Sequence, residues 1–271
     1  MDAIATLIVF ALGASIGSFL NVVVYRLPAQ ISLLWPPSRC PHCLHRLSKT
    51  ENVPVVGWLW LRGRCRHCQA PISMRYPLVE TATGLLFSWV FWQFGTSLNT
   101  LGYWAFLSWL LALALIDLDT MTLPNPLTQS GLVAGLVFQA AIGWQVSQGT
   151  GIASHLMAGI GSAVLGIWLF DAILMVGTIA FGQAAMGGGD PKLAATIGAW
   201  LGWKSLLLTG FLACALGASV GGGAIALGWI DRRQPIPFGP FLALAAALTL
   251  FWGQFILSSY LNLFFPIANN S

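Results

Sequence analysis

Apolar residues fill most of the chain in long runs, without the alternation of a half-buried strand or the narrow stripe of a soluble helix. A helix of roughly 20 apolar residues crosses a bilayer. The runs predict eight such helices, of which the sixth is the shortest: 3–25, 76–94, 101–116, 127–144, 155–181, 193–203, 206–230 and 241–265. We therefore expect an all-α fold, a polytopic transmembrane helix bundle.

Composition and charge support this fold class. Hydrophobic residues make up 57% of the chain and charged residues 7%, with a mean hydropathy of +0.78, whereas soluble domains carry about 25% charged residues. Eight of the twelve Lys and Arg residues lie in the segment 26–75. Basic loops stay on the cytoplasmic side, so we expect this segment to be a cytoplasmic insertion between the first two helices. The net charge of +4 then reflects topology, and nucleic acid is not an expected partner.

The insertion contains two C-x-x-C pairs separated by 21 residues. Such pairs are typical of a tetrahedral zinc site, and a loop of about 50 residues with little apolar content would gain folding energy from the metal. A closed four-cysteine shell leaves no ligand position for a substrate, so this zinc would be structural. A redox dithiol pair and cysteines of no special role are the competing interpretations. The expected metal ligands are Cys40, Cys43, Cys65 and Cys68.

Aspartates at the cytoplasmic ends of the predicted helices are the candidates for chemistry. Asp117 and Asp119 follow the third helix, and Asp190 follows the fifth. The predicted topology brings them to one membrane level, where a carboxylate pair would leave one group protonated and the other free to activate water. Two alternatives remain open. Asp190, which precedes a proline, fits a helix N-cap, and Asp117, Asp171 and Asp190 fit a cation or proton pathway.

Three neighbours of Asp190 are expected to support it. Gly187 and Gly189 lack a Cβ atom, and so permit a turn and the close approach of a substrate backbone. Lys192 would favour an ionised carboxylate or contact lipid head groups. Glu80 lies near the start of the second predicted helix, where an ion pair with a basic residue and a direct role are equally compatible with its position.

The order of these motifs resembles the bacterial type IV prepilin peptidases, which are membrane enzymes with leader peptidase and N-methyltransferase activities. The resemblance covers nearly the whole chain, and its motifs appear in the family's order. They are GSFLNVVVYRLP at 17–28, the two cysteine pairs, RGRC at 62–65, RYPLVE at 75–80, IDLD at 116–119 with Leu123 and Pro124, GGGD at 187–190 with Lys192, and IPFGP at 236–240.

The resemblance implies a function for each region. Asp117 and Asp190 would be the catalytic pair, with Asp119 in support. They would cleave the basic leader of a prepilin or pseudopilin after its terminal glycine, at the cytoplasmic face of the bacterial inner membrane. The new N-terminal amine would then receive a methyl group from S-adenosylmethionine.

The same resemblance predicts three regions with different functions along the chain. Residues 1–25 would form the first helix, 26–75 the cysteine-rich loop and site of methylation, and 76–271 the protease core. Glu80 is the one candidate for a role with the methyl donor. Membrane lipid and a prepilin or pseudopilin are the expected partners.

Two departures from the family pattern stand out. Asn125 occupies a position where many members have aspartate, and the outer loop around 145–154 is longer than in some relatives. Two functions of other classes remain as alternatives: a transporter that uses the intramembrane aspartates, and a non-catalytic assembly factor held by the zinc loop. Substituting Asp117→Asn or Asp190→Asn distinguishes the enzyme from the assembly factor, because the enzyme loses cleavage and the assembly factor keeps its activity.

Overall fold

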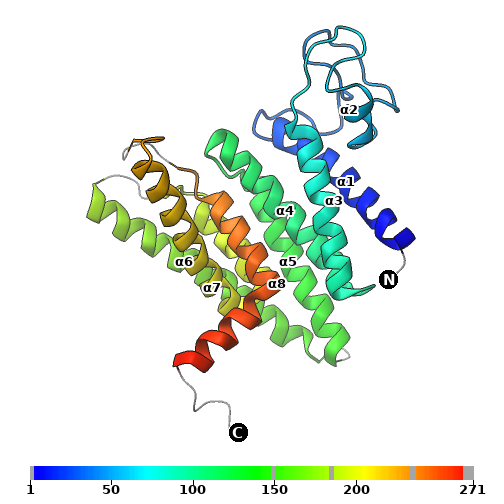
Figure 1. Ribbon diagram of the computed structural model, residues 1–271. Coiled ribbons are helices and arrows are strands. Elements are labelled where there is room, and N and C mark those ends of the chain that lie inside the picture. The colour runs from blue at the N-terminus through cyan, green and yellow to red at the C-terminus, as the bar shows by residue number, and fades with distance from the viewer. Residues whose placement is uncertain (1–2, 148–149, 183–185, 232–235, 265–271) are drawn as a thin grey trace. The chain divides into compact units, whose positions relative to one another are not determined.

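The computed structural model describes residues 3–147, 150–182, 186–231 and 236–264. Within these ranges the regular elements are helices, together with two isolated bridges in the cysteine loop. The chain forms two compact units, Met1–Ala112 and Leu113–Ser271. The helices, shown in Figure 1, are α1 (Ala3–Arg26), α2 (Val56–Trp60), α3 (Arg75–Phe94), α4 (Leu98–Thr120), α5 (Asn125–Ser147), α6 (Ile152–Phe181), α7 (Asp190–Ala226) and α8 (Gly239–Phe264).

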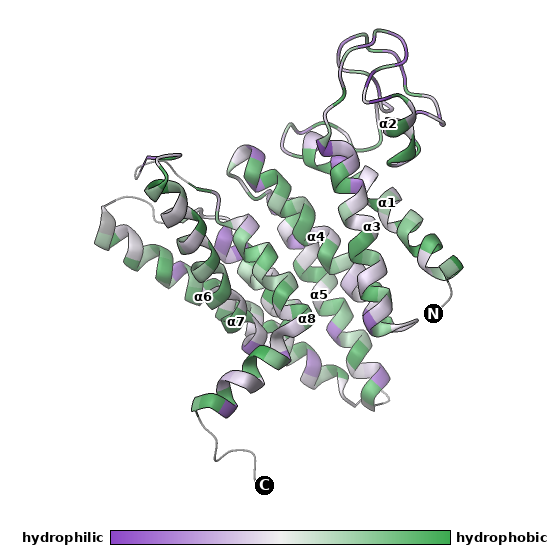
Figure 2. Ribbon diagram, in the orientation of Figure 1, coloured by the Kyte–Doolittle hydropathy of each residue, from purple (hydrophilic) through white to green (hydrophobic). Residues whose placement is uncertain are grey.

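Six of the described helices are long and apolar enough to cross a membrane, which confirms the predicted fold class. They are α1 and α4 to α8, and Figure 2 shows hydrophobic colour along most of their length. The other predicted crossing, α3, has 20 residues and carries more polar side chains, among them Arg75 and Glu80. The remaining helix, α2, has five residues and belongs to the cysteine loop.

Close packing of α1 against α3 organises the first unit. A Cβ atom on Gly13 would lie 2.8 Å from the Phe87 Cβ, and one on Gly17 would lie 2.8 Å from the Glu80 Cα. Only glycine permits this approach of two helix backbones. The start of α4 joins the pair, because the Trp104 indole stacks on Phe87 at 4.9 Å and donates a hydrogen bond to its carbonyl at 2.9 Å.

Small residues also bring α6 against the first part of α7 in the second unit. A Cβ atom on Gly166 would lie 2.8 Å from the Ala194 carbonyl oxygen, and one on Gly198 would lie 2.5 Å from the Ser162 carbonyl oxygen. On the neighbouring helix α5, the Gly131 carbonyl accepts a hydrogen bond from the Trp200 indole at 2.8 Å. The first half of α7 is therefore the buried centre of this unit, and it carries Asp190 at its first residue.

Helix α7 folds back on itself at Gly202, whose φ of 79° and ψ of 170° are not helical. A straight helix of 37 residues would be about 55 Å long. Asp117 interacts electrostatically with Asp190 and also accepts a hydrogen bond from the Gly239 N–H. The twelve residues 227–238 extend at most about 40 Å, so they could not return from the end of a straight helix.

The neighbours of α7 show the same reversal. On α6, Gly166 lies against Ala194 and Ser162 lies against Gly198, so the first half of α7 runs antiparallel to α6. Phe170 of α6 lies against Gly210, so the second half of α7 returns in the opposite direction. The predicted sixth and seventh crossings are thus one helix broken at a single glycine. Its first half, 190–201, is about 18 Å long, which is shorter than the hydrocarbon core of a bilayer. The second half runs beside α8 (Figure 1).

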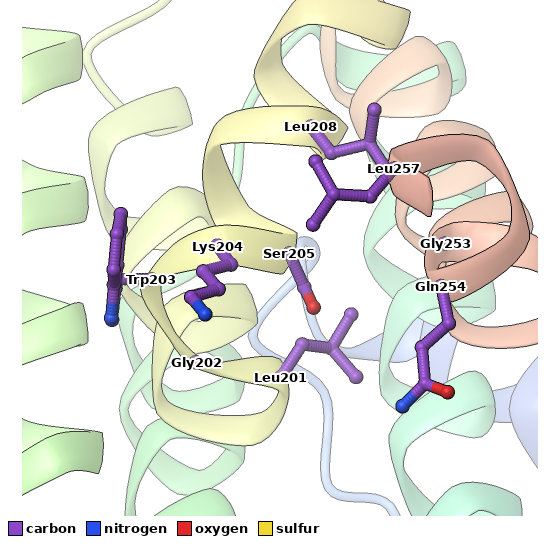
Figure 3. A pocket seen from close by; sticks show the side chains of 9 residues that line it. All are labelled: Leu201, Gly202, Trp203, Lys204, Ser205, Leu208, Gly253, Gln254 and Leu257. Carbon is purple, nitrogen blue, oxygen red and sulfur yellow. The ribbon is translucent and has the colours of Figure 1, made fainter. Parts of the chain in front are cut away.

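A cavity of about 280 Å³ lies at this reversal, between α7 and α8. Figure 3 shows Lys204, Ser205 and Gln254 around it, together with leucines from both helices. Leu201, on its wall, is eleven residues along α7 from Asp190, which corresponds to about 17 Å. The cavity is therefore separate from the carboxylates.

Candidate active site and metal centre

Asp117 and Asp190 lie buried at helix ends in the second unit, with 6% and 3% of their surfaces exposed. Asp117 belongs to the last turn of α4, and Asp190 is the first residue of α7. The charge of Asp117 acts on Asp190, so the two groups repel each other when both are ionised. The structure thus brings together two carboxylates that are 73 residues apart in the sequence.

A glycine backbone N–H holds one oxygen of each carboxylate. The Gly239 N–H donates to Asp117 Oδ2 at 2.9 Å, and the Gly187 N–H donates to Asp190 Oδ2 at 3.0 Å. Backbone donors stabilise a carboxylate strongly and fix its rotamer. Neither Oδ1 atom has a hydrogen bond within the described residues. Each aspartate is thus held through one of its two carboxylate oxygens.

The glycines around the pair serve mainly to leave room. A Cβ atom on Gly239 would lie 2.7 Å from Asp117 Oδ2, and one on Gly189 would lie 2.7 Å from the Leu123 Cβ. Gly189 has ordinary helical angles, φ −88° and ψ −24°. The packing of Leu123 thus requires a residue without a Cβ atom at this position, and the predicted role of the glycines in substrate approach stays a prediction. A Cβ atom on Gly188, by contrast, meets nothing within 4 Å.

The other sequence candidates near the pair take different positions. Lys192 donates from its ammonium group to the Asn125 Oδ1 at 2.6 Å, which ties the start of α7 to the start of α5. Asp119 is exposed, and two residues place it about 200° around α4 from Asp117. Asp171 is exposed on α6. The sequence did not single out Gly239 as a partner of Asp117, although it lies in the IPFGP motif that was noted as part of the resemblance.

The four predicted cysteines form a second site in the first unit. The sulfur atoms of Cys40, Cys43, Cys65 and Cys68 all lie within 4.8 Å of one another. The pairs across the two motifs are close, with 3.7 Å between the Cys40 and Cys68 sulfurs and 3.9 Å between those of Cys43 and Cys65. This confirms the predicted grouping of the cysteines.

Both C-x-x-C motifs have the same backbone turn. The Cys40 N–H donates to the His45 carbonyl at 2.9 Å, and the Cys65 N–H donates to the Ala70 carbonyl at the same distance. Leu44 and Gln69 take positive φ values of 56° and 59° at equivalent positions. Two similar turns thus present two sulfur atoms each, which is the arrangement that a tetrahedral metal ion requires.

The donor set fits a bound zinc ion. Zinc binds thiolates, and four cysteine sulfur atoms within 4.8 Å of one another match its tetrahedral shell. The His45 and His67 rings stack on each other with centroids 3.5 Å apart. They therefore have a packing role beside the four sulfur atoms.

Glu80 is buried, with 8% of its surface exposed, and it contacts the cysteine loop. Its Oε2 accepts a hydrogen bond from the Val55 backbone N–H at 2.6 Å, and the Ser18 side chain donates to the same carboxylate. The sequence left an ion pair open for this residue. The structure instead gives it a backbone partner 25 residues away.

The loop offers no familiar fold for a methyl donor. Its described residues contain α2 and two isolated bridges, Arg39 with Arg46 and Arg64 with Pro71. A glycine-rich turn from a strand into a helix, which many nucleotide cofactors occupy, does not occur among them.

Two family models match the chain. The family model described as the bacterial peptidase A24 N-terminal domain matches residues 11–94, and the type IV leader peptidase family matches residues 104–222. A prepilin leader peptidase/N-methyltransferase of Aeromonas hydrophila is 41% identical, covering 95% of this chain and 94% of the relative.

Proteins of the same name from two other bacteria are similarly close. The one from Stutzerimonas stutzeri is 38% identical over 93% of this chain and 92% of its own length. The one from Burkholderia pseudomallei strain 1026b is 39% identical over 89% of this chain and 84% of its own length. No solved structure matches the chain significantly.

Proposed function

The chain belongs to the type IV leader peptidase family, and from that premise we propose that it cleaves prepilin leaders with Asp117 and Asp190 as its catalytic pair. The chain is an enzyme and a multi-pass membrane protein. The observation that carries the residue assignment is the buried carboxylate pair, in which each member is fixed through one oxygen by a glycine N–H.

The pair has the chemistry for peptide hydrolysis. Because two neighbouring carboxylates cannot easily both ionise, one holds a proton and the other acts as the base. The base takes a proton from water, and the resulting hydroxide attacks the carbonyl carbon of the scissile amide. The protonated carboxyl donates to the carbonyl oxygen, and the collapse of the tetrahedral intermediate releases the leader and a new amine. Water supplies both the OH and the H of the products.

The substrate is a prepilin or pseudopilin whose basic leader stays in the cytoplasm. Its following apolar segment would pack among the helices, with the leader junction at the level of Asp117 and Asp190. The excess of Lys and Arg in the segment 26–75 supports a cytoplasmic position for the active site in the bacterial inner membrane. The membrane lipid is then the solvent of the apolar helix faces.

We assign the methyl transfer to the cysteine-rich loop, residues 26–75, and the protease core to residues 76–271. The four cysteines would hold a structural zinc ion that orders the loop. S-adenosylmethionine would supply the methyl group to the amine that cleavage exposes. The two activities would thus act in sequence on one N-terminus.

One assay tests both proposals. Purified protein in detergent is incubated with a prepilin and labelled S-adenosylmethionine, and leader release and methyl incorporation are followed separately. Wild-type protein is expected to release the leader and to incorporate methyl groups. With an intact prepilin, Asp190→Asn is expected to do neither. A prepilin already lacking its leader should still be methylated by Asp190→Asn. Leader release by this variant at the wild-type rate would defeat the assignment of the pair.

A further inference from the structure

The Glu80 carboxylate of α3 accepts a hydrogen bond from the Val55 backbone N–H of the cysteine loop at 2.6 Å. Glu80 lies in the second turn of α3, where Gly17 of α1 packs against the Glu80 Cα atom. The Asn21 amide of α1 donates to the Tyr76 carbonyl of α3 at 3.2 Å in the same region. The carboxylate is therefore fixed in a tightly packed helix pair.

Its partner, Val55, has a strained backbone. The φ of 61° and ψ of −55° are values that a β-branched residue rarely adopts. The Val56 N–H donates to the Pro54 carbonyl at 2.6 Å, which closes a three-residue γ-turn of the rare, positive-φ form. Strained turns persist only where their surroundings determine them. A charged acceptor at 2.6 Å from the Val55 nitrogen is such a determinant.

The turn sets the start of α2, and α2 in turn contacts the second cysteine motif. Helix α2 has no side-chain N-cap, so its first residue depends on this turn. Within α2, the Trp58 indole donates to the Ile72 carbonyl at 3.1 Å, and a Cβ atom on Gly63 would lie 2.7 Å from the Trp58 ring. The Ile72 N–H donates to the Gly63 carbonyl at 2.7 Å. Gly63 and Ile72 enclose the segment that carries Cys65 and Cys68.

We propose that Glu80 is a positioning residue for methyl transfer, which holds the Val55 turn and thereby fixes α2 and the second cysteine motif relative to α1 and α3. This role rests on the proposed function of the loop in methylation. Glu80 then takes no part in the chemical step itself. Its effect passes through a series of contacts, from its carboxylate to Val55, to Trp58 and on to the turn that carries Cys65 and Cys68. Leader cleavage depends on a different pair of carboxylates and does not require this link.

The test combines hydrogen exchange with the two activities. In Glu80→Ala, the backbone amides of the segment 52–61 should exchange at least about tenfold faster, and methyl transfer to a leader-free prepilin should fall about tenfold. Leader cleavage should stay within about twofold of wild type. Glu80→Gln keeps an acceptor oxygen but no charge, so its exchange rate and its methyl transfer should lie between those of wild type and Glu80→Ala.

Glu51→Gln is the matched control. The Glu51 carboxylate accepts a backbone N–H from Ser48 at 2.7 Å within the same loop, and among the described contacts it has no hydrogen bond to α1 or α3. It should leave the exchange of segment 52–61 and methyl transfer unchanged. Faster exchange there in Glu51→Gln, equal to that of Glu80→Ala, would overturn a specific role for Glu80.

A second variant distinguishes positioning from direct chemistry. Glycine adopts positive φ at little cost, so Val55→Gly should restore most of the exchange protection and the methyl transfer of Glu80→Ala. If protection returns while methyl transfer stays low, Glu80 acts directly and the positioning role is wrong. If wild-type protein shows no methyl transfer, the assignment of the loop fails, whereas the exchange data still decide whether Glu80 holds the turn.

Discussion

The cysteine cluster and the aspartate pair hold their reactive side chains in opposite ways. Each C-x-x-C motif forms its own local turn, and four sulfur atoms meet within 4.8 Å where a metal can join them. Each aspartate instead depends on a glycine N–H and on helix packing, and Asp117 receives its hydrogen bond from Gly239, 122 residues away. We therefore expect the first site to respond to metal removal, and the second to respond to changes in the packing of its unit.

The largest expected effect separates the paired aspartates from their neighbour. Asp117→Asn removes the proposed base or acid of the pair, so leader cleavage should fall by about 10³-fold or more. Asp119→Asn is the matched control, because Asp119 is exposed on the same turn of α4. Its cleavage rate should stay within about threefold of wild type. The measurement is kcat/KM for leader release in detergent, with thermal unfolding to verify the fold.

An equal loss in both variants would show that the IDLD segment acts as a whole. A near-normal rate in Asp117→Asn would remove Asp117 from the pair and favour a structural role for its bond to Gly239.

The second effect tests the cysteine site alone. Cys65→Ser removes a buried ligand from a loop that has little apolar core, so the metal content should fall and the loop should become sensitive to trypsin. Methyl transfer should fall about 100-fold, while cleavage changes less than about threefold. Cys214→Ser is the control, since this cysteine lies exposed on α7. Metal analysis and the two activity assays provide the measurement.

Equal loss of both activities in Cys65→Ser would mean that the two regions are not independent. A chelator that removes the metal from wild-type protein should have the same effect as Cys65→Ser, a loss of methyl transfer with little change in cleavage. Both treatments release the cross-link among the four sulfur atoms.

The third effect concerns the packing beside Asp190. A Cβ atom on Gly189 would overlap Leu123, whereas one on Gly188 would meet nothing within 4 Å. Gly189→Ala should therefore shift the start of α7 and lower leader cleavage about tenfold. Gly188→Ala should lower it less than about twofold. Equal effects of the two variants would favour a role for the glycines in substrate approach, as the sequence suggested, over the packing role found in the structure.

Sequence reasoning reached the local features and missed the distant ones. Runs of apolar residues predict helices because burial in lipid requires them, and C-x-x-C spacing predicts a metal site because each motif is its own turn. The bond between Gly239 and Asp117 and the bond between Val55 and Glu80 have no local signal. They depend on tertiary packing, which brings a backbone N–H to a carboxylate from another element.

The reversal of α7 is a second feature that the sequence pattern did not reveal. The sequence predicted two crossings, 193–203 and 206–230, from their apolar content. It could not reveal that the break is a single residue, Gly202, with a positive φ and no loop. Hydropathy averages over many residues, whereas the direction of a chain can change at one glycine. The count of apolar runs was useful, and the boundary between them required the structure.

The smallest expected effect concerns Asn125, where many family members have aspartate. It tests whether a charge added at the start of α5 reaches the aspartate pair. The Lys192 ammonium donates to the Asn125 Oδ1 at 2.6 Å, and this contact is exposed. Asn125→Asp should convert the hydrogen bond into an ion pair worth about 0.2–1 kcal/mol, because solvent screens surface charges. Leader cleavage should change less than about threefold, and the midpoint of thermal unfolding should rise slightly at low salt. Lys192→Gln in the Asn125→Asp background should abolish that rise, and adding salt should do the same. A tenfold change in cleavage would instead mean that the new carboxylate acts on Asp190, so that the active site extends to the start of α5.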